Sequence, residues 1–279
     1  RSIQKVKLSL PHPHQYGGIN DPLAGILGFT IKEQALNSEY GLYICNPPSG
    51  DKPIVAVDPY GSDEEKLNFT YFHEVTHHLI RIDDDIYGFL DGLATKDQDL
   101  NALKERFANI GAAEFLLPSN EVREFINKHS FSVKLIQELD QIYPASKPAI
   151  AIQLARFATH KCFVLICAFD QNRLEKQEQA HLLESEALAI SKVLYVQYSA
   201  SSPSNKYSIA RNIPISKQHM LWEIFEQKID FSKGYALIPF RSQRDWKTDC
   251  EGMYYKGKVY AIFNLEKPNP PENIQPRLL

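Results

Sequence analysis

The spacing of hydrophobic positions changes along the chain. Residues 1–60 contain three apolar segments of strand length, separated by stretches rich in Asn, Ser, Pro and Gly, which turn the chain. The segments are Ile26–Ile31, Gly41–Cys45 and Pro53–Val57. This pattern predicts a small antiparallel meander.

A helical pattern follows. Four apolar residues recur at every fourth position and so form one stripe on a helix: Leu67, Tyr71, Val75 and Leu79. Before the stripe, Ser62-Asp63-Glu64-Glu65 is typical of a capping box, in which the Ser62 hydroxyl and the Glu65 carboxylate satisfy N–H groups of the first turn. Further helices are expected over 98–116, 121–128, 132–142 and 145–158.

After residue 161 hydrophobic residues again tend to alternate with polar ones, as in β-strands. Strands are expected over 162–169, 192–198, 207–210, 234–240 and 258–264, with a helix over 218–227 and a charged loop over 170–179. The fold class is therefore α+β with several domains: 1–120, a helical bundle over 121–160, an α+β domain over 161–265 and a Pro-rich tail over 266–279, which is expected to be disordered.

Composition excludes several classes of protein. The 279 residues are 43% hydrophobic and 23% charged with a net charge of −3, which disfavours both a disordered chain and a strongly basic nucleic-acid binder. The longest apolar run is 163–169, too short to span a membrane, and no signal-like segment follows Arg1. We therefore expect a cytoplasmic protein that lacks its natural start. The four cysteines form no CxxC pair and are expected to be reduced core thiols.

The strongest chemical signal is His73-Glu74-Val75-Thr76-His77, which lies within the first predicted helix. Residues four apart lie on one helix face, so both imidazoles can bind one metal ion. Glu74 then flanks the open coordination position, where it can take a proton from water.

A third ligand is expected from a neighbouring helix. Glu105 is the best candidate, because small or apolar residues share its helix face and let two helices approach closely: Ala108, Ala112 and Phe115. Asn109, one turn further on, is placed to orient the Glu105 carboxylate. By spacing alone, an exposed Glu105 paired with a nearby Lys or Arg stays open.

These motifs resemble the ImmA/IrrE family of metallopeptidases. The matching residues are Phe72-His73-Glu74-x-x-His77 and Glu105-x-x-x-Asn109-x-x-Ala112-Ala113-x-x-Leu116-Leu117-Pro118, with further similarity to IrrE-type sequences at Asp83-Asp84-Asp85, 199–208 and 238–244. The resemblance implies a metal ion held by His73, His77 and Glu105, with Glu74 as catalytic base. The expected metal is Zn²⁺, with Mn²⁺ or another divalent ion as an alternative.

The resemblance also implies an architecture and a partner. The N-terminal zinc-peptidase-like domain would be followed by a helix-turn-helix-like bundle and a GAF-like domain that takes a small-molecule ligand. The substrate would be an Xre-type helix-turn-helix repressor, DdrO in IrrE-type members, whose cleavage induces a DNA-damage or radiation response.

Other residues admit a simpler interpretation. His78 points about 100° away from His77, so a surface or interface position is expected. The Asp83–Asp85 run is expected to be a solvated helix end, and His12 and His14 to belong to an extended arm. Candidates for the group that stabilises an oxyanion include Tyr60, Tyr71 and Arg106, and the sequence does not choose among these and others.

The alternative function is a non-catalytic transcriptional regulator or DNA-binding protein with a structural metal site. Direct DNA binding is not expected, because residues 132–158 contain only three basic side chains, Lys134, Lys147 and Arg156. The intact Glu74 also disfavours a purely structural metal, which needs no base.

Overall fold

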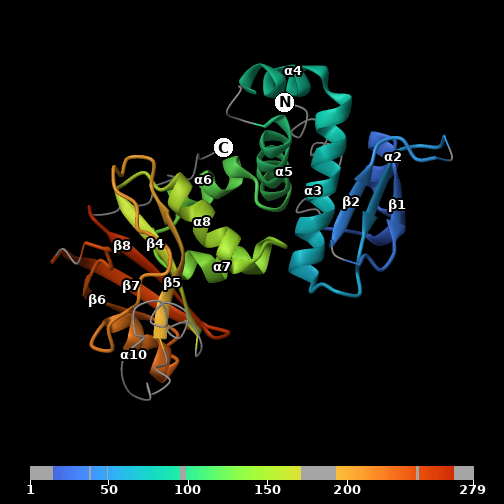
Figure 1. The fold of residues 1–279 in the computed structure, drawn as a ribbon. Helices are drawn as coiled ribbons and strands as arrows, with labels where there is room; N and C mark the ends of the chain where they lie inside the picture. The colour runs from blue at the N-terminus through green and yellow to red at the C-terminus, as the bar shows by residue number, and fades with distance from the viewer. Residues whose placement is uncertain are drawn as a thin grey trace, which may run out of the picture. The chain divides into compact units, whose positions relative to one another are not determined.

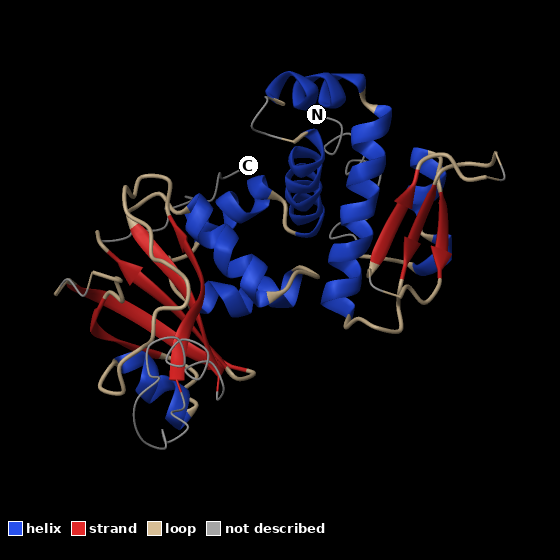
Figure 2. Cartoon of the chain, viewed as in Figure 1, coloured by secondary structure: helices blue, strands red, loops and turns tan. Residues whose placement is uncertain are grey.

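The computed structural model describes residues 15–37, 39–48, 50–94, 99–170, 193–242 and 245–266. The chain forms two compact units, one of residues 1–119 with 140–146 and one of 120–139 with 147–279 (Figures 1 and 2). Both contain helices and strands, so the chain is α+β. The finer division into helix-turn-helix-like and GAF-like domains stays a prediction.

The first unit opens with a short 3₁₀ helix, η1 (Gly18–Asn20), and the helix α2 (Pro22–Leu27). The strand expected over Ile26–Ile31 is therefore wrong in its first half. The Asp21 carboxylate accepts a hydrogen bond from the N–H of Leu23, and Gly28, at a φ of 80°, ends the helix in the left-handed conformation.

Three strands form a mixed sheet in the order β1-β3-β2: β1 (Thr30–Glu33), β2 (Gly41–Ile44) and β3 (Ile54–Val57). The expected antiparallel meander is wrong, because β3 lies between the other two strands and pairs in parallel with β1. Strand β2 is left at an edge of this sheet.

Three helices complete this unit: α3 (Glu64–Ile82), α4 (Asp84–Leu93) and α5 (Leu100–Leu116). The capping box at Ser62 is wrong, because the Asp63 carboxylate accepts from the N–H of Lys66 at 2.8 Å and caps α3 instead. The stripe is confirmed, since Tyr71, Val75 and Leu79 are all buried. The acidic run is a helix end, as expected: Asp83 caps α4, and its two neighbours lie exposed in the first turn.

The second unit contains a five-stranded antiparallel sheet in the order β5-β4-β8-β7-β6. Its strands are β4 (Cys162–Asp170), β5 (Val193–Ser201), β6 (Ser232–Leu237), β7 (Lys247–Tyr255) and β8 (Lys258–Asn264). The helices that follow α5 are α6 (Ser119–Lys128), α7 (Lys134–Ile142), α8 (Lys147–Phe157) and α10 (Met220–Gln227). Side chains of β4 alternate between two faces, and those of Phe163, Leu165 and Cys167 join the core beneath α10.

In this unit one predicted strand is wrong and one observed strand was not predicted. Residues 207–210 form a loop, whereas β7 was not expected because its N-terminal half reads Lys-Thr-Asp-Cys-Glu-Gly. Its buried Glu251 accepts hydrogen bonds from the Ser132 hydroxyl and the Lys233 ammonium, which tertiary contacts alone provide. The expected loop after residue 170 and the Pro-rich tail after residue 266 lie outside the described residues.

Three of the four cysteines lie in the core of the second unit, as expected. Burial raises the thiol pKa of Cys162 and Cys167 to about 12, so both stay protonated and unreactive. The expectation is wrong for Cys45, which is exposed just after β2. No helix among the described residues is long and apolar enough to cross a membrane.

Candidate metal centre

Two helices of the first unit bring together the three side chains that the sequence singled out as ligands. His73 and His77 lie one turn apart on α3, and Glu105 projects from α5. The Nε2 atoms of the two imidazoles are 3.1 Å apart, and each lies 3.3 Å from one oxygen of the Glu105 carboxylate. Among the described residues, these three form the one cluster of His, Cys, Asp and Glu that could hold a metal ion.

The donor spacing fits a divalent metal ion. Tetrahedral ligands at bond lengths of about 2.0–2.1 Å lie roughly 3.3 Å from one another, which matches the observed separations. The carboxylate is 61% exposed and the two imidazole side chains about 16%, so the cluster has a buried side and an open side. Three donors with one open face leave room for a water molecule or a carbonyl oxygen.

Close packing of α3 on α5 makes this convergence possible. A Cβ atom added at Gly111 would lie 2.4 Å from both Cγ2 and Oγ1 of Thr76, so the helices meet at a glycine. One turn away, the rings of Phe72 and Phe115 stack with centroids 5.0 Å apart. The contact holds Glu105 within reach of α3.

Glu74 lies beside the cluster and is only 8% exposed. Burial raises the pKa of its carboxyl group to about 7, with smaller contributions from the charges of Glu105 and Glu39. A hydrogen bond from the backbone N–H of Tyr43, on β2, opposes this shift and holds the carboxylate against the edge strand.

Gly41 on β2 is a residue that the sequence analysis did not identify. A Cβ atom there would lie 2.9 Å from Cγ and Oε1 of Glu74 and 2.5 Å from Cγ2 of Thr70. The strand therefore approaches the base as closely as a backbone can. A glycine inside a predicted strand is the available signal, since it often marks such an approach.

His78 is not a ligand, as expected, but it is buried rather than at the surface. Its Nδ1 lies 3.0 Å from the Tyr43 hydroxyl and its Nε2 lies 3.0 Å from the carbonyl oxygen of Leu27. Burial lowers the pKa of this imidazole, so the neutral ring joins α3 to the sheet and to the end of α2.

The remaining candidates differ in accessibility. Asn109 is exposed and makes no hydrogen bond to Glu105 among the described residues, so its orienting role stays a prediction. Tyr71 lies in the core against Tyr16, which keeps its hydroxyl away from any substrate. Tyr60 and Arg106 are exposed and stay candidates for stabilising an oxyanion. His12 and His14 lie outside the described residues.

A helix that carries His-Glu-x-x-His, joined by a Glu from a second packed helix, is the ligand arrangement of metal-dependent peptidases. Residues 24–154 match the IrrE N-terminal-like domain. This match, which covers a little under half of the chain, supports an ImmA/IrrE-type metallopeptidase domain over these residues.

Two curated relatives are similar over most of the chain. The radiation response metalloprotease IrrE of Deinococcus radiodurans is 24% identical over 88% of this chain and 71% of the relative. Its namesake from Deinococcus deserti is 26% identical over 72% of this chain and 67% of the relative. A solved structure titled Mycobacterium tuberculosis transcriptional regulator shares the fold, with a TM-score of 0.53 and 11% identity over 94% of this chain and 75% of that chain.

Proposed function

We propose that the protein is a site-specific, metal-dependent endopeptidase that cleaves an Xre-type helix-turn-helix repressor, similar to DdrO, and so induces a DNA-damage or radiation response. The observation that carries the proposal is the convergence of His73, His77 and Glu105 beside the buried carboxylate of Glu74. The two relatives named as radiation response metalloproteases support it.

Each residue of the centre has a distinct role in this proposal. His73, His77 and Glu105 hold the cation, with Zn²⁺ expected from the donor set. A divalent cation there supplies Lewis acidity toward the peptide carbonyl group and lowers the pKa of a water molecule. Glu74 accepts the proton of the attacking water and passes it to the leaving amine. Its buried carboxyl group, with a pKa raised toward neutrality, is suited to both transfers.

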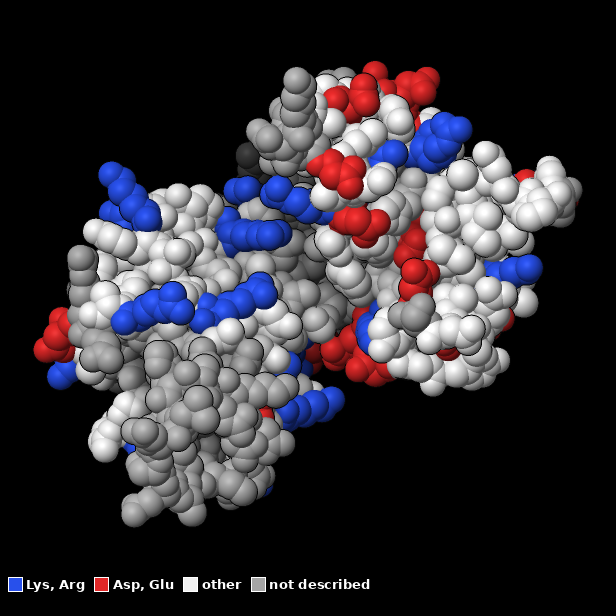
Figure 3. Space-filling model, in the orientation of Figure 1, with Lys and Arg blue, Asp and Glu red and all other residues white. Residues whose placement is uncertain are grey.

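Surface charge supports a basic segment as the part of the substrate that is cut. In the view of Figure 3, Asp and Glu predominate on the first unit. Exposed acidic side chains lie in the first turns of α3 and α4, at Glu64, Glu65, Asp84 and Asp85. Complementary charge raises the encounter rate with a cationic chain segment and orients it.

Packing of the helices that follow α5 disfavours direct DNA binding. The Lys134 ammonium lies over the Phe231 ring, and the buried Lys147 ammonium lies 4.0 Å from the centre of the Tyr255 ring. Two of the three basic side chains of residues 132–158 thus pack on aromatic rings of the C-terminal part of the chain instead of facing phosphates. We propose that the bundle docks the repressor and that the C-terminal α+β domain is a GAF-like sensor domain. The reaction would take place in the cytoplasm, where such repressors act.

The test is cleavage of Xre-type repressors from the same genome by the metal-loaded protein. We expect one cut with the wild type and a rate at least 100-fold lower with Glu74→Gln, which is the lower end of the effect of a general base. Glu226→Gln is the matched control, because Glu226 is an exposed carboxylate on α10, in the unit that does not carry the metal centre. Dialysis against a chelator and reloading with Zn²⁺ or Mn²⁺ identifies the active ion.

Equal cleavage by the wild type and Glu74→Gln would refute the assigned base. The rival function, a regulator with a structural metal, requires that repressor inactivation survives the loss of Glu74 without any cut in the repressor chain. Mass spectrometry of the repressor separates these outcomes.

A further inference from the structure

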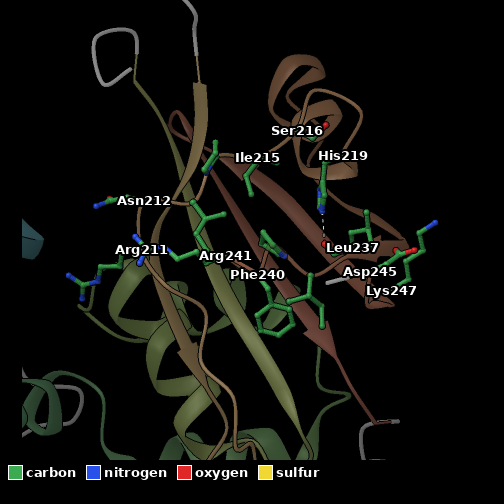
Figure 4. Close-up of a pocket in the computed structure, with 14 residues that line it drawn as sticks. Arg211, Asn212, Ile215, Ser216, His219, Leu237, Phe240, Arg241, Asp245 and Lys247 are labelled. Atoms are coloured by element: carbon green, nitrogen blue, oxygen red, sulfur yellow. Dashed lines mark hydrogen bonds between the residues drawn. The ribbon is translucent and has the colours of Figure 1, made fainter. Parts of the chain in front are cut away.

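The second unit contains a cavity of about 890 Å³ that the peptidase chemistry does not use. Figure 4 shows its walls, which come from residues 211–216, the start of α10, and the segment that joins β6 to β7. Pockets of roughly 300–1,000 Å³ suit small organic ligands. All of its lining residues belong to one compact unit.

Backbone hydrogen bonds fix the first wall on the edge strand β5. The N–H of Asn212 donates to the carbonyl oxygen of Val196 at 2.8 Å, and the N–H of Ile215 donates to that of Leu194 at 2.7 Å. Asn212 turns the chain at a φ of 66°, a left-handed conformation that Asn tolerates better than most residues. The wall is thus formed before any ligand binds.

His219 fixes the opposite wall and is not available for proton transfer. Its Nδ1 accepts from the N–H of Leu221, so the proton lies on Nε2, which donates to the carbonyl oxygen of Leu237 at 2.7 Å (Figure 4). The neutral ring therefore joins α10 to the end of β6. Ser216 is also engaged, because its hydroxyl donates to Gln218. The pocket is built for binding and lacks a free nucleophile–base pair among its described residues.

The charges of the pocket are mainly positive. Arg211, Arg241 and Lys247 are exposed at its walls, against a single carboxylate from Asp245. None of the three cations forms an ion pair with a described residue, and Arg211 is steadied by the Tyr198 ring, 5.0 Å from its guanidinium carbon. Figure 4 shows both arginines on one side of the pocket and Asp245 with Lys247 on the other.

Apolar side chains lie between these charged sides. Ile215 and Ile238 are 4% and 2% exposed, and the Phe240 ring is held edge-on against Phe163, with centroids 5.7 Å apart. A ligand that fits must therefore combine a strongly anionic end with an apolar or planar body. Guanidinium groups recognise phosphate oxygens through paired N–H donors.

We propose that this pocket binds a small phosphorylated organic molecule, whose phosphate group lies on the side of Arg211 and Arg241 and whose body packs on Ile215 and Phe240. The site requires no metal ion and lies on the unit that does not carry the metal centre. Its occupancy is therefore measurable without any protease assay.

Isothermal titration calorimetry of the full chain tests the proposal with named probes: purine and pyrimidine nucleoside monophosphates, a hexose phosphate, the matching nucleosides and inorganic phosphate. We expect at least one organic phosphate to bind at least tenfold more tightly than both its uncharged counterpart and inorganic phosphate. Arg211→Gln and Arg241→Gln should each weaken this binding roughly tenfold, equivalent to about 1.4 kcal/mol, because each removes a charged hydrogen-bond donor to the phosphate. Lys206→Gln, an exposed cation of the same unit outside the pocket, should leave it unchanged.

Several results would overturn the proposal. These are no saturable binding of any organic phosphate up to about 10 mM, equal binding of nucleoside and nucleotide, equal binding of inorganic phosphate, or equal weakening by Lys206→Gln. Preferential binding of single-stranded DNA, lost in the arginine variants, would instead assign the surface to nucleic acid. Because all substitutions lie at exposed positions, circular dichroism melts of the variants should match the wild type and exclude misfolding as the cause.

Discussion

Gly111→Ala is the substitution that most directly tests how the two ligand-bearing helices are held together. The added Cβ would lie 2.4 Å from two atoms of Thr76, whereas carbon atoms in contact prefer roughly 3.5–4.0 Å. The helices α3 and α5 must therefore separate by about 1 Å, a distance set by the difference between these values. Glu105 lies on the same rigid helix, so this separation also moves its carboxylate away from His73 and His77.

Two opposing terms set the expected size of the effect. Overpacking of a core contact costs about 1–3 kcal/mol, whereas Ala in place of Gly inside a helix gains about 1 kcal/mol. The free energy of unfolding should thus fall by up to about 2 kcal/mol. Gly88→Ala on α4 is the matched control, because no atom lies within 4 Å of its added Cβ, and it should stabilise the protein.

The assay combines urea unfolding with Zn²⁺ affinity measured by chelator competition. We expect roughly tenfold weaker Zn²⁺ binding for Gly111→Ala, equivalent to about 1.4 kcal/mol, and unchanged binding for Gly88→Ala. In a double-mutant cycle, Thr76→Ala removes both clashing atoms and should restore Zn²⁺ affinity in the Gly111→Ala background. Stabilisation by Gly111→Ala equal to that of Gly88→Ala, with no coupling to Thr76, would refute the close-contact argument.

Three further substitutions test the metal centre and the second unit. Glu105→Gln should weaken metal binding by at least roughly 100-fold in chelator competition, because losing a direct ligand costs more than losing its hydrogen-bonding partner; unchanged affinity would exclude Glu105 as a ligand. Gly41→Ala should displace the Glu74 carboxylate and slow repressor cleavage at least roughly tenfold, while Zn²⁺ affinity changes less than threefold. Equal losses of cleavage rate and Zn²⁺ affinity would contradict a selective effect on Glu74. Burial lowers the pKa of His219 in the folded protein. The neutral ring therefore contributes to the free energy of unfolding above pH 6.5, and this contribution is lost as the pH falls through the lowered pKa. Urea unfolding between pH 8 and pH 5 should show a stability difference between the wild type and His219→Asn that shrinks toward acid; a difference independent of pH would contradict this.

Local periodicity was enough to predict the part of the site that lies on one helix. The positions of His73 and His77 follow from helix geometry alone, because residues four apart share a face whatever surrounds them. The spacing of small residues around Glu105 likewise predicted the close helix contact. The same residues made Glu105 the best candidate for the third ligand, but spacing alone left open an exposed Glu105 paired with a Lys or Arg. The resemblance to a family favoured the ligand, since no local rule relates side chains 28 residues apart on two helices.

Features that depend on distant contacts were missed. Strand β7 carries the buried Glu251, which accepts hydrogen bonds from Ser132, just before α7, and from Lys233 on β6. A sequence that places a charged residue at a buried position lacks the pattern by which strands are predicted. The parallel pairing of β1 with β3 has no signal in either segment. In contrast, the predicted cap of α3 was wrong by one residue only. Ser62 was expected and Asp63 is observed, and both residue types are well suited to cap a helix.

Two glycines of the metal centre explain why its geometry is harder to predict from the sequence than the identity of its ligands. Gly41 brings the edge strand to one side of α3, against Glu74, and Gly111 brings α5 to another side, against Thr76. Each acts through an absent Cβ, so neither adds to the apolar stripe or to the charge pattern by which elements are predicted. The ligand types define which chemistry the site can perform, whereas these close approaches fix how near the base and the third ligand come to the two imidazoles. A chain that kept the His-Glu-x-x-His motif but carried larger residues at both positions would retain the motif and lose the centre.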